Sequence, residues 1–144
     1  MNHNIKFTKL SDIDKDGGSL IYLTCKMNGE KVNLIIDTGA SRTCIDRSCY
    51  DNIIAGTTER ILKKNVKTAG VGNNQIKSTL AEIDEIKFNR LIINNFVIVV
   101  TDLSNINAIM GNKLRIDGVL GNDIFEDYQA VINYQKSTIR FTSL

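Results

Sequence analysis

The sequence predicts an all-β fold in a single domain, and three observations carry this prediction. Runs rich in β-branched and aromatic residues recur at regular spacing, as in barrels and sandwiches. The Asn28-Gly29 pair between two such runs is a strong hairpin signal. Only one short segment late in the chain, residues 123–128, favours a regular helix. The 144 residues fit one domain, without a linker or a repeat.

The first half of the chain is expected to begin with a compact strand pair. Residues 19–27 form the outgoing strand, and residues 30–36 form the returning strand, which ends directly before Asp37. Residues 43–45 are expected to form a further short strand. Residues 46–61 have a mixed pattern with one helical turn.

The second half is expected to contain a long hairpin, further core strands and a closing hairpin. Residues 65–70 and 75–83 flank the turn-rich residues 71–74, so this hairpin has an exposed tip. Residues 85–93 are expected to form a strand pair or one strand with a bend, followed by a turn at Asn94-Asn95 and a strand at 96–100. The remaining expected elements are a loop at 102–115, a strand at 116–120 and a hairpin of 131–134 with 138–141.

Composition and charge exclude several classes of function. The net charge of +2 is too small to indicate binding to nucleic acid. No apolar run approaches the roughly 20 residues of a membrane helix. The first seven residues have no apolar core of signal-peptide length. Localisation stays open between the cytoplasm and, if a signal was removed, the periplasm or the exterior.

The most informative stretch of the chain is Leu34-Ile35-Ile36-Asp37-Thr38-Gly39-Ala40. Its apolar run predicts a buried strand that ends in a lone carboxylate. A charge at the end of a buried strand is costly unless it is paired or used. Because Gly39 allows a tight turn, this pattern indicates an aspartate presented at the floor of a cleft.

Elimination points to the same chemistry. The only histidine is His3, near the N-terminus, which argues against Ser-His-Asp and Cys-His catalysis and against a zinc site. Cys25, Cys44 and Cys49 are an odd set that argues against a disulfide framework. Cys25 is expected to pack as a small hydrophobe, and a local bridge between the other two stays open.

Carboxylates can hydrolyse a bond when two of them hold a water molecule and share one proton. The chain carries a single Asp-Thr-Gly, so one subunit supplies half of such a site. A two-fold homodimer completes it, because an isologous contact places each Asp37 opposite its copy. We therefore expect a homodimer and no metal or organic cofactor.

Two motifs together resemble the retropepsin-like (retroviral-type, clan AA) aspartic proteases, including bacterial members. They are the stretch around Asp37 and the downstream Val119-Leu120-Gly121. The resemblance implies an acid-protease closed barrel with a flap hairpin and one short C-terminal helix. It implies catalytic roles for Asp37, Thr38 and Gly39, with Thr38 bonding across the dimer axis. It places Val119-Leu120-Gly121 beneath the loop that carries the acid.

The resemblance also implies a substrate-binding surface. Ala40 and Ser41 follow the acid loop, and Gly70, Val71 and Gly72 lie where the family has its flap. The substrate that the resemblance implies is a peptide or protein. Retroviral members have an aspartate at the position of Ser41, so the acid that contacts the substrate main chain there is expected to be missing here.

Asp117 and Asp123 have simpler interpretations. Asp117-Gly118 is typical of a turn, and Asp123 is expected to cap the late helix. A direct catalytic role is expected for neither.

Near the N-terminus, Asp12, Asp14 and Asp16 resemble the start of a calcium loop. Leu23 occupies the twelfth position, where that loop requires a glutamate, so a solvated acidic turn is preferred.

The sequence divides into an N-terminal extension, residues 1–18, and a retropepsin-like domain, residues 19–144. The expected function is that of a homodimeric aspartic endopeptidase. Two alternatives stay open: a catalytically silent peptide-binding or dimerisation module on the same fold, and an enzyme that residues 1–18 hold inactive.

Overall fold

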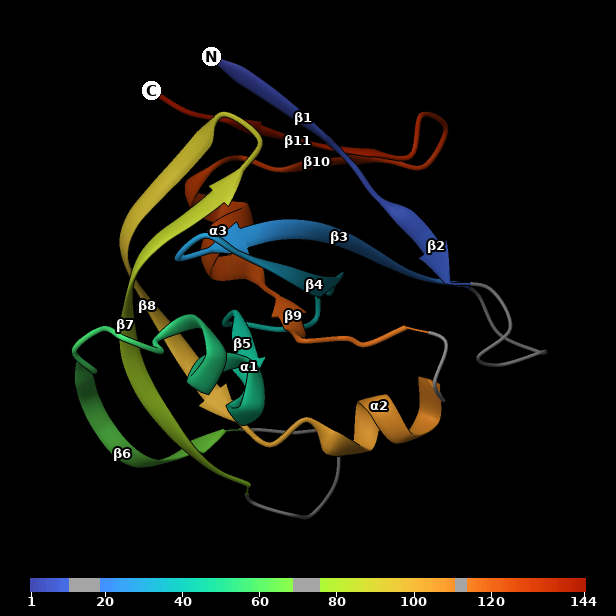
Figure 1. Cartoon of the computed structure of the whole chain (residues 1–144). Helices are drawn as coiled ribbons and strands as arrows, with labels where there is room; N and C mark the ends of the chain where they lie inside the picture. The colour runs from blue at the N-terminus through green and yellow to red at the C-terminus, as the bar shows by residue number, and fades with distance from the viewer. Residues whose placement is uncertain (11–18, 69–75, 111–113) are drawn as a thin grey trace.

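The fold is that of a computed structural model, which describes residues 1–10, 19–68, 76–110 and 114–144 (Figure 1). The acidic turn around Asp12 to Asp16 lies outside the described residues, and so does the hairpin tip with Gly70, Val71 and Gly72. No helix within the described ranges has the length and apolar character needed to span a membrane.

Six strands close into a barrel in the order β3-β4-β9-β5-β8-β7, and β7 pairs again with β3. Two further strands extend this sheet, with β2 pairing with β3 and β6 pairing with β7. The strands are β2 (Thr8–Leu10), β3 (Leu20–Met27), β4 (Glu30–Ile36), β5 (Cys44–Asp46), β6 (Ile61–Thr68), β7 (Ile76–Phe88), β8 (Leu91–Thr101) and β9 (Gly118–Leu120).

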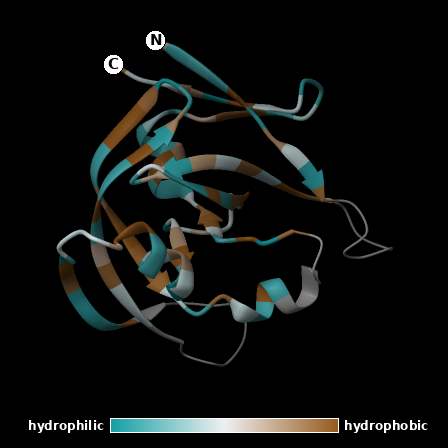
Figure 2. Cartoon of the chain, viewed as in Figure 1, coloured by the Kyte–Doolittle hydropathy of each residue, from teal (hydrophilic) through white to brown (hydrophobic). Residues whose placement is uncertain are grey.

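Alternating burial explains why these segments form barrel strands. In β3, Ile21, Leu23, Cys25 and Met27 are buried while the residues between them are more exposed. The same alternation of hydrophobic and hydrophilic residues is visible along the barrel strands in Figure 2. The predicted strands at 19–27 and 30–36 are confirmed.

The predicted turn between these strands is confirmed as well. Asn28 and Gly29 both have positive φ angles, 49° and 85°. Two successive positive φ angles are the geometry of a hairpin turn whose twist matches that of its flanking strands.

A smaller sheet of three strands in the order β1-β11-β10 lies at one end of the molecule (Figure 1). Its strands are β1 (Asn2–Lys6), β10 (Val131–Asn133) and β11 (Thr138–Thr142), so the closing hairpin is confirmed. The strands β1 and β2 were not expected from the sequence. The division at residue 18 stays a prediction, although Ile5 and Phe7 belong to the core of the fold.

Three helices occur in the described residues: α1 (Arg47–Ile53), α2 (Ser104–Met110) and α3 (Asn122–Asp127). The late helix is confirmed, but the expectation of one helix was too low. The loop predicted over residues 102–115 is wrong where α2 forms, since Asp102 Oδ1 accepts a hydrogen bond from Ser104 N at 2.9 Å and turns the chain into that helix. The predicted cap of α3 is also wrong, because Gly121 is its N-cap.

The turn predicted at Asn94-Asn95 is wrong. The chain reverses instead at Asn89-Arg90, between β7 and β8, and β8 continues through both asparagines. Asn89 adopts a positive φ of 53°, a conformation that asparagine tolerates better than most residues. Asn95 has the same φ of 53° inside the strand, and its turn-like sequence signal reflects that backbone conformation.

Gly118 is the most crowded of the glycines in the described residues. It starts β9, between Leu34 of β4 and Ile45 of β5. A Cβ atom there would overlap the carbonyl oxygen of Cys44 and lie 2.9 Å from Cδ2 of Leu34. We expect Gly118→Ala to lower the free energy of unfolding by about 1–3 kcal/mol or more, because strands on both sides must shift. An unchanged urea midpoint would contradict this packing.

Candidate active site

Asp37 is the first residue after β4 and lies at the surface of the barrel. Leu34, Ile35 and Ile36 are buried, whereas Asp37 is exposed. The β4 strand runs parallel to β9, and Asp37 N donates a hydrogen bond of 3.1 Å to Leu120 O at the end of that strand. The core therefore fixes the backbone of the acid while its side chain faces outward.

The loop that follows holds the carboxylate in one orientation. Gly39 N donates a hydrogen bond of 2.8 Å to Asp37 Oδ1, and Ala40 N donates one of 3.1 Å to Asp37 O. A Cβ on Gly39 would lie 3.1 Å from Asp37 Oδ1, so a glycine allows this close approach. Within the described part of the chain, Asp37 Oδ2 accepts no hydrogen bond and faces outward unpaired.

The first residue of α3 holds the acid loop by hydrogen bonds. Asn122 N donates a hydrogen bond of 2.9 Å to Ala40 O, and Asn122 Nδ2 donates one of 2.7 Å to Thr38 O. A Cβ on Gly121 would lie 2.7 Å from the carbonyl carbon of Arg42. The acid loop and the Val119-Leu120-Gly121 segment, which the resemblance places together, therefore contact each other through Gly121 and Asn122.

A buried threonine joins the same two segments. Thr43 is fully buried, and its hydroxyl donates a hydrogen bond of 2.7 Å to Asp123 Oδ1. The Thr43 hydroxyl also accepts one of 3.0 Å from Gly121 N, and Thr43 N donates one of 2.9 Å to Asp123 Oδ2. Asp123 is thus a brace for the acid loop. Sequence reasoning missed this pair, because no local pattern links residues 80 positions apart.

The predicted site residues before the hairpin share one loop. Asp37, Thr38, Gly39 and Ser41 are exposed and Ala40 is partly buried. The structure brings these five together.

A family model described as aspartyl protease matches residues 23–124. This range includes β4, the acid loop, β9 and the first residues of α3, which are the elements that build the site. The chain belongs to the aspartyl protease family. No curated protein sequence matches it.

Solved structures show that this chain has the retropepsin-like fold. The EIAV protease, solved with the inhibitor HBY-793, matches with a TM-score of 0.57 and 19% identity over 78% of this chain and 90% of that one. The retroviral protease-like domain of Ddi1 from Leishmania major matches with a TM-score of 0.58 and 13% identity over 87% and 90%. A retropepsin-like aspartic protease from Rickettsia conorii matches with a TM-score of 0.56 and 18% identity over 98% and 90%.

A thiol lies close to the acid loop. Cys44 stands opposite Val119 across β5 and β9 and is partly buried. Burial raises the pKa of the Cys44 thiol to about 11, and a backbone hydrogen bond with Val119 offsets part of this rise. The thiol is therefore neutral near pH 7 and unsuited to act as a nucleophile. Cys44 and Cys49 are both free, so the local bridge is not formed.

Asp117 and His3 have partners that explain them without catalysis. Asp117 Oδ2 accepts a hydrogen bond of 2.9 Å from Asn33 N, and its Oδ1 lies 3.1 Å from Arg115 Nε. These contacts fix the residues that precede β9, at the end of the strand opposite Gly121. His3 Nε2 lies 2.9 Å from Ser143 Oγ, in the pairing of the two termini.

Proposed function

We propose that this chain is an aspartic endopeptidase that acts as a homodimer, with a water molecule held between two Asp37 side chains. The single observation that carries the proposal is the half-satisfied carboxylate of Asp37. Its Oδ1 is held by Gly39 N–H, while its Oδ2 is exposed and accepts no hydrogen bond within the described residues. A second copy of the same loop supplies the missing partner.

The proposed chemistry follows from the closeness of two carboxylates. Two carboxyl groups about 3 Å apart cannot both be ionised, because their negative charges repel each other. The pair therefore shares one proton and titrates as a unit. The water attacks the peptide carbonyl carbon, and the ionised Asp37 accepts a proton from that water. The protonated Asp37 donates its proton to the carbonyl oxygen. Thr38 is proposed to bond across the axis and to keep the two loops in register.

The substrate is proposed to bind as an extended peptide. The strands β6 and β7 pair antiparallel beside the barrel. Gly70, Val71 and Gly72, which follow β6 in the sequence, are proposed to close over the peptide. Ala40 and Ser41, next to the acid, are proposed to contact the peptide main chain from the other side. Extended peptides are recognised by main-chain hydrogen bonds, with alternate side chains in pockets.

A peptide library incubated with the wild-type chain near pH 4–6 tests this function. We expect internal cleavage, and we expect the specific activity to fall on dilution, because separated subunits each hold half a site. Mass spectrometry of the products and activity measured over a dilution series give both readouts. Specific activity independent of concentration, with sedimentation showing a monomer, would contradict the shared site. Intact peptides under all conditions would favour the silent binding module.

A further inference from the structure

Three lysines lie side by side across three strands on the outside of the barrel. Lys26 of β3 stands directly opposite Lys31 of β4 and, on its other edge, directly opposite Lys87 of β7. All three side chains are exposed, while the neighbouring Cys25 and Met27 are buried. Directly opposed residues have Cβ atoms about 4.5–5.5 Å apart, so the three lysine side chains start close to one another.

This arrangement costs stability in the free protein. Like charges directly opposite one another on a sheet are destabilising. The ion pairs among the described residues involve Arg60 and Arg115, and none includes these three lysines. The repulsion is therefore not relieved by a carboxylate from the described part of the chain.

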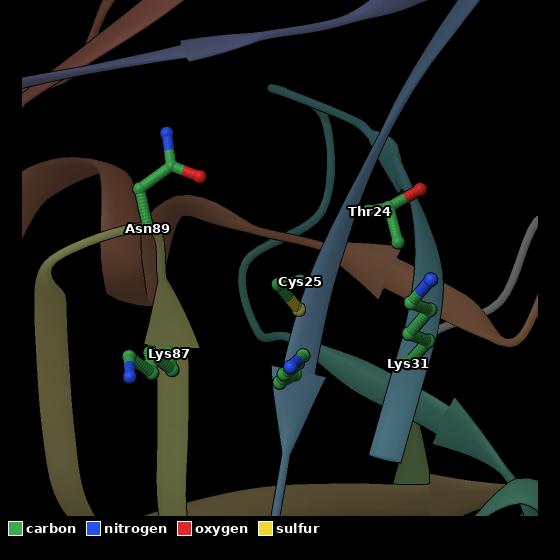
Figure 3. Close-up of a pocket in the computed structure, with 6 residues that line it drawn as sticks. Thr24, Cys25, Lys31, Lys87 and Asn89 are labelled. Atoms are coloured by element: carbon green, nitrogen blue, oxygen red, sulfur yellow. The ribbon is translucent and has the colours of Figure 1, made fainter. Parts of the chain in front are cut away.

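The lysines surround a pocket of about 350 Å³ that Thr24, Cys25 and Asn89 also line. Figure 3 shows Lys87 and Asn89 on one side of the pocket and Thr24 and Lys31 on the other. Asn89 Nδ2 donates one hydrogen bond, of 3.3 Å, to Asn4 O, and among the described residues its second N–H has no acceptor and can donate to a ligand. The pocket thus combines three cations with a neutral donor.

We propose that this pocket binds a compact polyphosphate group, such as an inorganic polyphosphate or the phosphate chain of a nucleotide. Three clustered ammonium groups require a multivalent anion, and lysine is a common phosphate ligand. A volume of about 350 Å³ suits a small ligand. The net charge of +2 is too small to indicate binding to nucleic acid, so a small anion is favoured.

The pocket is separate from the candidate active site. Lys31 lies near the start of β4 and Asp37 just after its end, so six residues of extended strand, about 20 Å, separate them. The proposal therefore stands whether or not the chain cleaves peptides.

Isothermal titration of the full chain with sodium tripolyphosphate, at constant ionic strength, tests the proposal. Wild type is compared with Lys26→Gln, Lys87→Gln and the matched control Lys136→Gln, an exposed lysine in the turn between β10 and β11. We expect each pocket variant to raise Kd at least tenfold and Lys136→Gln to leave it within twofold. Equal weakening by all three variants would show only general charge attraction and would overturn the proposal, as would no binding by the wild type.

Thermal unfolding provides a second readout that does not depend on the titration. Without ligand, Lys26→Gln is expected to melt above the wild type, because the central charge of the row is gone. With tripolyphosphate, the melting temperature of the wild type is expected to rise more than that of the variant. A parallel titration with ATP distinguishes the source of the phosphate chain: binding of both ligands assigns the site to phosphate groups, whereas binding of ATP alone would overturn the proposal.

Discussion

Asp37→Asn should lower kcat/KM for peptide cleavage by roughly 10²–10⁴-fold or more, the range expected when a general acid–base group is lost. An asparagine can neither accept the proton of the water nor donate one to the carbonyl oxygen. Its side-chain oxygen can still accept the hydrogen bond from Gly39 N, so the loop and the dimer should persist. Cleavage rates and sedimentation of the same preparation measure both expectations.

The matched control for this variant is Asp51→Asn. Asp51 is exposed on α1, outside the acid loop, and the same change of charge there should leave the rate unaltered. Equal loss of activity in both variants would indicate a general effect of charge on the protein. Undiminished cleavage by Asp37→Asn would assign the activity to another group or to a contaminating protease.

Thr43→Val should cause the largest loss of stability among polar changes near the site. The two side chains have nearly the same shape, but valine removes the hydroxyl that donates to Asp123 Oδ1 and accepts from Gly121 N. Asp123 Oδ1 still accepts a hydrogen bond of 2.9 Å from Ile124 N, but Gly121 N loses its acceptor. A buried polar group without a partner costs about 1–3 kcal/mol, so we expect a loss of that size in the free energy of unfolding. Urea unfolding measures it.

The same change should also affect the reaction, because Gly121 and Asn122 support the acid loop. We expect kcat to fall while the dimer is still present. Thr8→Val, at an exposed position of β2, is the control and should change stability by less than about 0.5 kcal/mol. A midpoint for Thr43→Val equal to that of this control would show that the buried hydroxyl does not brace the loop.

Local chemistry explains which features could be predicted from the sequence. The Asn28-Gly29 turn was predictable because only a few residues tolerate two successive positive φ angles. The placement of Asp37 after a buried strand was predictable from three apolar residues followed by an acid and a glycine. Both signals lie within a few neighbouring residues.

The features that the sequence did not predict depend on distant partners. The β1 strand is polar and weakly patterned, and it forms because β11, more than 130 residues away, offers an edge to pair with. Likewise, Asp123 looks like a helix cap from its neighbours alone. Only the fold brings Thr43 beneath it and turns that acid into a brace for the loop.

The stoichiometry of a tight-binding inhibitor tests the central claim most directly. A pepstatin-type transition-state analogue is titrated against a known concentration of chains until cleavage stops, and the mass of the complex is measured by sedimentation. The account predicts one inhibitor per two chains, bound to a dimer. One inhibitor bound to each monomeric chain, with full inhibition, would contradict a site that two copies of Asp37 build together.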